Sequence, residues 1–324
     1  MQTNKLGWTD LDLTPIGLGT WAIGGGGWQH SWGPQDDKDS IDTIKRAVDL
    51  GINWIDTAPV YGLGHCEEVV GKGIKGLRDK LVIATKCGLT WNKKRKISGK
   101  LKKESIRSEI EASLKRLDID TIDLYQIHWP MPDKEIEEAW TVIGGLIKEG
   151  KIRYAGVSNF NIEQLKRIEP IHPTASLQPP YSMLERGIER KELHYCSEKN
   201  IGVIAYSPMQ EGLLTGKFTV DHVQNLPKDD HRRYGKHFQN PELEINLKFV
   251  EDLASIAEKN NMTVAQLSLA WVLKNPAITA AIVGARRPSQ IEETVTAGDL
   301  TLNKEQIDLI QALLDKRRDR VDQI

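Results

Sequence analysis

The stretch NWIDTAPVYG, residues 53–62, has the pattern of a buried β-strand that ends on a carboxylate, Asp56. Tyr61 follows in a segment where Pro59 and Gly62 prevent regular secondary structure from continuing. For any single pair of this kind, the ordinary explanation is a polar loop after a core strand, with the tyrosine covering the core. Whether Asp56 and Tyr61 have a function therefore depends on which residues end the other strands.

Short apolar runs rich in β-branched residues recur along the chain, and a segment with helical periodicity follows each run. Because the runs are apolar throughout rather than alternating, we expect parallel strands covered on both faces. The predicted strands are Ile16–Thr20, Ile52–Asp56, Leu81–Thr85, Ile122–Ile127, Arg153–Val157, Thr174–Gln178, Gly202–Tyr206 and Thr279–Val283.

Eight such units in 324 residues predict one (β/α)8 barrel domain, an α/β fold, over residues 1–324. Extra helices are expected at Glu242–Lys259 and Thr263–Lys274, between the seventh and eighth strands. A further helix is expected near the C-terminus, at Lys304–Asp315.

An open doubly wound sheet is the competing fold, and one motif favours it. Residues 17–22, GLGTWA, fit the dinucleotide-binding pattern G-x-G-x-x-A after a strand. That pattern must open a helix whose N-terminus holds the pyrophosphate. Four consecutive glycines at 24–27 and then Pro34 follow instead, so no helix is expected before about Asp39. The segment is predicted to be a loop.

The overall composition argues against several classes of partner. The chain has 44 Lys and Arg against 45 Asp and Glu, so no long-range field attracts nucleic acid or an anionic membrane. The basic run 93–96 is interpreted as a solvated surface loop. No run approaches the length of a membrane span, and the start MQTNKLGWTDLDL lacks a signal-peptide apolar region. Three scattered cysteines form no disulfide framework. We therefore expect a cytoplasmic protein.

Reactive residues end three successive predicted strands. Asp56 and Tyr61 follow the second strand, Lys86 ends the third, and His128 ends the fourth. In a parallel barrel the carboxyl ends of all strands share one face, so these four side chains are expected around one opening. Each alone has an ordinary explanation as a polar strand end, but together they meet the requirements of carbonyl reduction.

That reaction needs a general acid, and a phenol is a weak one at neutral pH. An ammonium at Lys86 is expected to lower the pKa of Tyr61, with Asp56 as the counter-ion of that ammonium. His128 is expected to hydrogen-bond the substrate oxygen.

In this order and on these strands, Asp56, Tyr61, Lys86 and His128 resemble the catalytic tetrad of the aldo-keto reductases. The resemblance extends from GLGTW near the start to IVGARRPSQIEET near the end, and is closest to the bacterial general-stress and inositol-utilisation branch. It implies NADP(H) bound to a (β/α)8 barrel without a Rossmann motif. The implied reaction is reduction of aldehydes or ketones to alcohols, with Tyr61 as proton donor.

The resemblance also implies cofactor contacts at the remaining strand ends. Ser158, Asn159 and Gln178 are expected to hold the nicotinamide carboxamide, and Tyr206 to stack on the nicotinamide ring. A belt, Ser207–Lys217, is expected across the pyrophosphate, with Lys217 as a phosphate contact. The other predicted contacts are Gly19, Thr20, Trp21, Asp56, Ser207, Pro208, Met209, Gln210, Gly212, Leu213, Gly216, Gly284, Gln290, Glu293 and Thr294.

Two arginines precede Pro288, which suits the first turn of a helix. Helix N-termini favour anions, and guanidinium groups hold phosphate through paired hydrogen bonds. We therefore expect Arg286 to contact the 2′-phosphate of NADP. Arg232 or Arg233 is expected to help Lys217 hold the phosphate at the belt. The chain departs from the family pattern at Thr294, where asparagine is usual, and at Cys66, where serine is usual and would cap a helix.

The carbonyl substrate is expected to meet Trp21, Tyr61, His128 and Trp129, since aromatic walls suit aldehydes and ketones. Two other functions remain open. A Schiff-base lyase would use Lys86 as a neutral nucleophile, which the neighbouring Asp56 disfavours. A subunit that binds NADP(H) with little turnover would share the same residues. No metal site is expected, and the family resemblance favours a monomer or a weak homo-oligomer.

Overall fold

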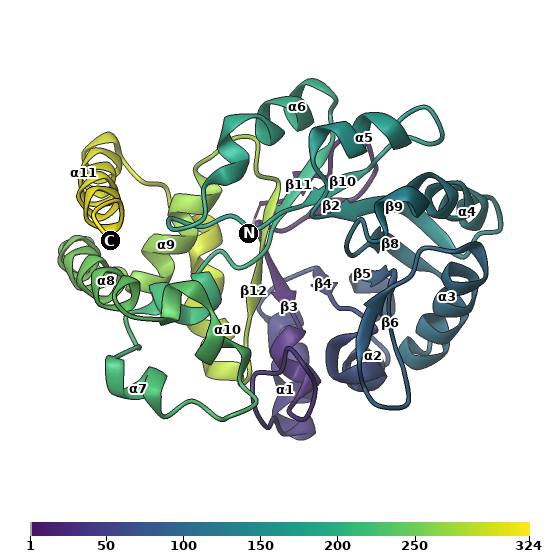
Figure 1. Ribbon diagram of the computed structural model, residues 1–324, viewed down its shortest axis with the longest axis horizontal. Coiled ribbons are helices and arrows are strands. Elements are labelled where there is room, and N and C mark those ends of the chain that lie inside the picture. The colour runs from purple at the N-terminus through teal and green to yellow at the C-terminus, as the bar shows by residue number, and fades with distance from the viewer. Residues whose placement is uncertain (1) are drawn as a thin grey trace.

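The computed structural model describes residues 2–324, and in them eight parallel strands form a closed barrel surrounded by helices (Figure 1). Pairing of the last barrel strand with the first closes the ring. The predicted (β/α)8 fold class is confirmed, and each predicted strand end lies within two residues of the observed one. The barrel strands are β3 (Ile16–Gly19), β4 (Trp54–Asp56), β5 (Val82–Cys87), β8 (Ile122–Ile127), β9 (Ile152–Ser158), β10 (Ser176–Gln178), β11 (Gly202–Ala205) and β12 (Ala280–Gly284).

Helices connect the strands and cover the barrel. They are α1 (Asp37–Asp49), α2 (His65–Gly73), α3 (Lys103–Leu117), α4 (Ile136–Lys148), α5 (Ile162–Ile168), α6 (Glu192–Glu198), α7 (Val220–Gln224), α8 (Glu242–Lys259), α9 (Val264–Leu273), α10 (Pro288–Val295) and α11 (Lys304–Val321). The predicted extra helices are α8, α9 and α11, of which α11 runs to Val321 instead of Asp315. Figure 1 shows α8 and α11 side by side at one edge of the barrel.

The glycine motif that formally matched a dinucleotide-binding loop has a packing explanation. A short 3-10 turn, η1 (Trp21–Gly24), and a loop separate it from α1, so the predicted loop is confirmed. A Cβ on Gly17 would lie 2.0 Å from the Trp54 ring, and one on Gly19 would lie 2.5 Å from Ile282. Both large side chains pack in the barrel interior, so the strand beside them has no room for side chains.

The barrel interior is apolar near the amino ends of the strands and polar at their carboxyl ends. Alternate residues of a strand share one face, so apolar and polar side chains can follow one another along the inside. Near the amino ends, Trp54, Leu124 and Ile282 pack with leucines of a hairpin formed by β1 (Asn4–Lys5) and β2 (Asp12–Leu13). At the carboxyl ends the same inward register carries the buried polar residues Asp56, Lys86, Gln126, Ser158 and Gln178.

Two hairpins were not predicted. One is β1–β2, and the other joins β6 (Leu89–Trp91) to β7 (Ile97–Gly99) directly after β5. Residues 93–96 form the turn of the second hairpin and are exposed, in agreement with their interpretation as a solvated loop. A separate cavity of about 640 Å³ lies near the amino ends of β5 and β9, where Arg78 and Arg153 both pair with Asp123. The two guanidinium groups share that one carboxylate, and the cavity lies away from the carboxyl ends of the strands.

Candidate active site

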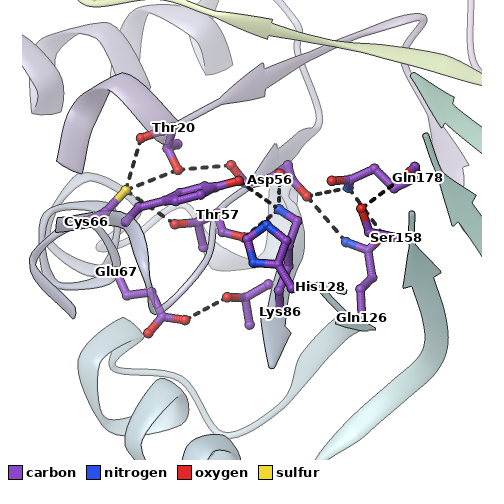
Figure 2. Close-up of polar contacts among 12 residues, drawn as sticks. Thr20, Asp56, Thr57, Cys66, Glu67, Lys86, Gln126, His128, Ser158 and Gln178 are labelled. Atoms are coloured by element: carbon purple, nitrogen blue, oxygen red, sulfur yellow. Dashed lines mark hydrogen bonds and ion pairs between the residues drawn. The ribbon is translucent and has the colours of Figure 1, made fainter. Parts of the chain in front are cut away.

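The structure brings Asp56, Tyr61, Lys86 and His128 together at the carboxyl ends of neighbouring strands. Figure 2 shows Asp56, Lys86 and His128 of this group. Lys86 Nζ donates to Asp56 Oδ1 at 2.5 Å and to Tyr61 Oη at 3.4 Å. The His128 ring lies edge-on to the Tyr61 ring, with 5.8 Å between ring centroids. The four side chains therefore meet where the barrel topology predicts, and their chemical roles are taken up below as proposals.

The Lys86–Asp56 pair is enclosed by protein. Lys86 is fully buried and Asp56 is 2% exposed, so each charge depends on the other for compensation. Nζ also donates to Thr57 O at 3.0 Å, which places an oxygen acceptor against each of its three N–H groups. A Schiff-base nucleophile needs a neutral amine with an accessible lone pair. This geometry argues against the lyase alternative.

The second carboxylate oxygen of Asp56 binds two glutamine amides (Figure 2). Gln178 Nε2 donates to Asp56 Oδ2 at 2.8 Å, and Gln126 Nε2 donates to the same atom at 3.3 Å. The sequence analysis did not identify Gln126. A signal was available, because Gln126 interrupts the apolar strand IDLYQI two residues before His128 and so shares its inward face.

The surroundings of Tyr61 keep its phenol protonated. Burial raises the pKa of Tyr61 well above its ordinary value, and the negative charge of Asp56 raises it further. The sequence analysis expected the opposite direction because it gave the Lys86 ammonium more weight than burial and the charge of Asp56. In the structure the carboxylate of Asp56 lies 2.5 Å from that ammonium, so the pair presents little net charge to Tyr61. Burial therefore decides the direction in which the pKa of Tyr61 shifts.

The imidazole of His128 is neutral at pH 7. Burial lowers the pKa of His128 well below its ordinary value, and the positive charge of Lys86 lowers it further. A neutral imidazole keeps one N–H donor. The backbone around it is held in place, since His128 N donates to Cys87 O at 2.9 Å and His128 O accepts from Asn159 Nδ2 at 3.0 Å.

The loop that carries Tyr61 is fixed by a close backbone approach. Gly62 has φ +61°, and a Cβ there would lie 2.3 Å from Gly24 O, so only glycine satisfies both conditions. Cys66 lies inside α2, two residues beyond the N-cap Gly64, so it does not cap this helix, and its thiol donates to Thr20 O at 3.2 Å. Burial raises the pKa of Cys66 to about 12, which leaves an unreactive thiol.

Aromatic rings form a wall beside Tyr61. Trp21 stacks on Tyr61 at 6.1 Å and on His231 at 4.6 Å between ring centroids. His231 comes from the long loop after β11, where its Nδ1 lies 3.0 Å from Ser31 O in the loop after β3. These two loops therefore support the wall together. Trp129, the other predicted substrate contact, is 40% exposed in the loop after β8.

The residues predicted for the nicotinamide carboxamide form one hydrogen-bonded group with the tetrad. Ser158 Oγ donates to Gln178 O at 2.8 Å, and Asn159 Nδ2 donates to Ser158 Oγ at 3.0 Å. Tyr206 Oη donates to Asn159 Oδ1 at 2.9 Å. The ends of β9, β10 and β11 are thereby joined to His128 through the Asn159 amide.

The loop after β11 carries the predicted belt and forms the 3-10 turn η6 (Gln210–Thr215). Ser207, Gln210 and Gly212 have positive φ, so the backbone turns sharply at several points. Leu213 packs its side chain into a small cluster with Phe238, which leaves only its backbone for a cofactor. Two other predicted contacts lie at the barrel: Gly19 pairs with Gly284 between strands, and Thr20 donates to Asp56 O. In the loop itself, Pro208 and Met209 are buried and Gly216 is exposed.

The residues predicted for the phosphate end hold one another. Lys217 pairs with Glu293 at 2.5 Å, and the side chain of Gln290 accepts from Arg286 N at 2.8 Å. Thr294 Oγ1 donates to Gln290 O, one turn earlier in α10. The Arg286 guanidinium donates to Gln35 Oε1 at 2.7 Å and to the carbonyls of Trp32 and Pro34, and the next residue, Arg287, is exposed.

The two arginines of the long loop have internal partners. Arg232 binds both carboxylate oxygens of the buried Asp230, at 2.9 and 2.6 Å. Arg233 donates to the carbonyls of Gln224 and Leu226. Their guanidinium groups therefore hold the long loop together, and the structure gives no reason to place either on a phosphate.

Across residues 2–324, no helix combines the length and the apolar character needed to span a bilayer. The same residues contain no cluster of three or more His, Cys, Asp or Glu side chains arranged to hold a metal ion.

Comparison with known proteins gives consistent matches along almost the whole chain. Residues 15–315 match the model of the Aldo/keto reductase family. Aldo-keto reductase YhdN of Bacillus subtilis is 41% identical over 97% of this chain and 94% of the relative. The NADH-specific methylglyoxal reductase of Escherichia coli is 36% identical over 97% of this chain and 99% of the relative. The structure of a glycerol dehydrogenase from Gluconobacter oxydans superposes with a TM-score of 0.88 at 39% identity, covering 98% of this chain and 96% of that one.

Proposed function

The chain belongs to the aldo/keto reductase family of oxidoreductases, which use nicotinamide coenzymes, and on that basis we propose that it reduces aldehydes or ketones to alcohols with NADPH. One observation carries the proposal. A buried phenol that holds its proton, Tyr61, lies 3.4 Å from the ammonium of Lys86 and beside the neutral imidazole of His128. Such a group can donate a proton and can then be stabilised as an anion.

A bound nicotinamide coenzyme would supply hydride to the carbonyl carbon. As the carbon–oxygen double bond opens, negative charge develops on the substrate oxygen, and the neutral N–H of His128 can donate to that oxygen. The O–H bond of Tyr61 then breaks and its proton completes the alcohol. The electron pair of that bond stays on Tyr61 as a phenolate.

Lys86 acts on the phenolate more than on the resting phenol. The hydrogen bond from Lys86 Nζ to Tyr61 Oη becomes charge-assisted at both ends once the phenol has lost its proton. Asp56 holds the ammonium in place at 2.5 Å and keeps it charged between turnovers. Burial keeps the pKa of Tyr61 above its ordinary value, and the hydrogen bond from Lys86 makes the anion formed during proton transfer less costly than burial alone would.

The residues at the other strand ends fit a nicotinamide dinucleotide. Ser158, Asn159 and Gln178 offer amide and hydroxyl groups beside the tetrad, which suit a carboxamide. Arg286 and Arg287 stand at the N-terminus of α10, where the helix dipole adds to their positive charge and suits a phosphate. This second feature supports NADPH over NADH, although the Escherichia coli relative is named as NADH-specific.

Replacing Arg286 by alanine tests the coenzyme proposal. We expect the affinity for NADPH to fall about 10- to 100-fold and the affinity for NADH to change little, because only NADPH carries the 2′-phosphate. Fluorescence titration of both coenzymes measures this. Arg286 also binds the loop at residues 32–35, so an equal loss for both coenzymes would mean loop damage instead. Arg287→Ala is the matched control, and a selective loss there would move the phosphate contact to Arg287.

Turnover itself is tested by following NADPH absorbance at 340 nm with a panel of aldehydes and ketones. Methylglyoxal and glyceraldehyde open the panel because the two named relatives act on methylglyoxal and on glycerol. We expect consumption of NADPH with at least one small aldehyde. Tight NADPH binding with no turnover across the panel would favour the alternative of a coenzyme-binding subunit.

A further inference from the structure

We infer that Gln126 is a positioning residue, which orients the Gln178 amide so that Gln178 presents its carbonyl oxygen to the carboxamide of the coenzyme. The inference rests on the proposed function, since it concerns the same coenzyme site. It concerns a residue that touches neither the substrate position nor Tyr61. Within residues 2–324 its side chain forms hydrogen bonds with Asp56 and Gln178 alone.

The three side chains form a closed triangle of hydrogen bonds (Figure 2). Gln178 Nε2 donates to Asp56 Oδ2 at 2.8 Å and to Gln126 Oε1 at 3.3 Å. Gln126 Nε2 donates to Asp56 Oδ2 at 3.3 Å. A carboxylate only accepts hydrogen bonds, so both amides must turn their nitrogen toward Asp56. That requirement leaves the side-chain oxygen of Gln126 facing the side-chain nitrogen of Gln178. The Gln178 nitrogen therefore donates one hydrogen to Asp56 and the other to Gln126.

Burial makes this arrangement hard to change. Gln126 is fully buried and Gln178 is 2% exposed, so water cannot easily replace a lost partner. If the Gln178 amide rotated by half a turn, its oxygen would face the oxygens of Asp56 and Gln126. Leaving buried polar groups unpaired costs about 1–3 kcal/mol each. The β9 strand makes room for the network, because a Cβ on Gly156 would lie 3.1 Å from Gln126 Cγ and 2.2 Å from Ser176 Oγ.

The oxygen of Gln178 is left as an open acceptor. Within residues 2–324 the side-chain oxygen, Gln178 Oε1, accepts no hydrogen bond, and it is not among the fully buried side-chain polar atoms that lack a partner. Next to it, Asn159 Nδ2 has used both hydrogens on Ser158 Oγ and His128 O. The free hydrogen-bonding capacity on this side of the site is therefore accepting, which matches the NH2 group of a carboxamide. Gln126 thus links the Lys86–Asp56 pair to recognition of the coenzyme.

The test compares NADPH with its 3-acetylpyridine analogue, in which an acetyl group replaces the carboxamide and removes the NH2 donors. In fluorescence titrations, we expect the parent protein to bind NADPH about tenfold more tightly than the reduced form of the analogue. In Gln126→Leu the second N–H of Gln178 loses its acceptor and only the bond to Asp56 still orients the amide, so the amide is held less firmly and this preference is expected to shrink to about twofold or less. Affinity for 2′,5′-ADP, which has no nicotinamide, is expected to stay unchanged in the variant.

A merely structural role for Gln126 would weaken all three ligands alike. Tyr125→Phe is the matched control, because Tyr125 neighbours Gln126 in β8 and its buried hydroxyl has no hydrogen-bond partner within residues 2–324. If Gln126→Leu does not fold, Gln126→Met provides the same loss of hydrogen bonding. A full preference for the carboxamide in a folded variant would overturn the inference.

The same titrations separate this inference from the proposed function. A parent protein that binds NADPH without turnover would undermine reduction and still permit the comparison. If the parent protein binds NADH more tightly than NADPH, the same comparison is made with NADH and the 3-acetylpyridine analogue of NADH. A parent that binds neither coenzyme would overturn both proposals.

Discussion

Replacing Tyr61 by phenylalanine is expected to lower kcat for carbonyl reduction by about 10²- to 10⁴-fold, the usual contribution of a positioned general acid. NADPH affinity is expected to stay within about twofold of the parent, because the removed hydroxyl bonds only Lys86 among residues 2–324. Stopped-flow single turnovers with NADPH and an accepted aldehyde measure the chemical step, and fluorescence titration measures binding. Tyr234→Phe, at a tyrosine that is 75% exposed, is the matched control.

The pH dependence sharpens this test. Burial raises the pKa of Tyr61 and lowers the pKa of His128, so the phenol keeps its proton and the imidazole stays neutral throughout the neutral range. The chemical step in the parent is therefore expected to be level between about pH 6 and 8, where an ordinary histidine would titrate. Reduction by Tyr61→Phe at the parental rate would remove Tyr61 from the role of proton donor.

Replacing Lys86 by methionine is expected to lower the free energy of unfolding by about 3–5 kcal/mol, because it leaves the buried carboxylate of Asp56 without its counter-ion. Catalysis is expected to fall as well, since the phenolate of Tyr61 loses its charged donor. Urea unfolding at pH 7, followed by circular dichroism, measures the stability. Lys38→Met is the control, because its pair with Asp42 is on the surface and is expected to matter little.

A double-mutant cycle identifies the cause of the lost stability. The Asp56→Asn/Lys86→Met protein has no buried charge at this position, so it is expected to be more stable than Lys86→Met alone. If the double variant is as unstable as the sum of the two single variants, the two residues are not energetically coupled. Loss of packing by the lysine side chain would then explain the effect of Lys86→Met.

Much of the fold followed from local patterns in the sequence. Apolar runs with punctuating glycines and prolines located each barrel strand to within two residues, and Asn161 with Gln164 forms a capping box that opens α5. The β1–β2 and β6–β7 hairpins were missed because their strands are only two or three residues long. Strands that short carry too little periodicity to be recognised.

The meeting of Asp56, Tyr61, Lys86 and His128 also followed from the sequence, since parallel strands in a barrel bring their carboxyl ends to one face. Which partner each side chain takes did not follow. Arg232, considered for a phosphate, binds Asp230 two residues before it, and His231, to which the sequence analysis gave no role, stacks on Trp21. Loops after different strands meet there, and no sequence period relates them.

The sequence by itself therefore determined the barrel, the order of its strands and the set of reactive side chains around its opening. These features depend on short apolar strands that alternate with helical segments along the chain. Only the tertiary structure decided that the pKa of Tyr61 rises and that Gln126 joins Gln178 on Asp56. Both outcomes depend on burial and on distances of a few ångströms between charges and amides from separate strands. Those quantities exist only once the strands have closed into a barrel.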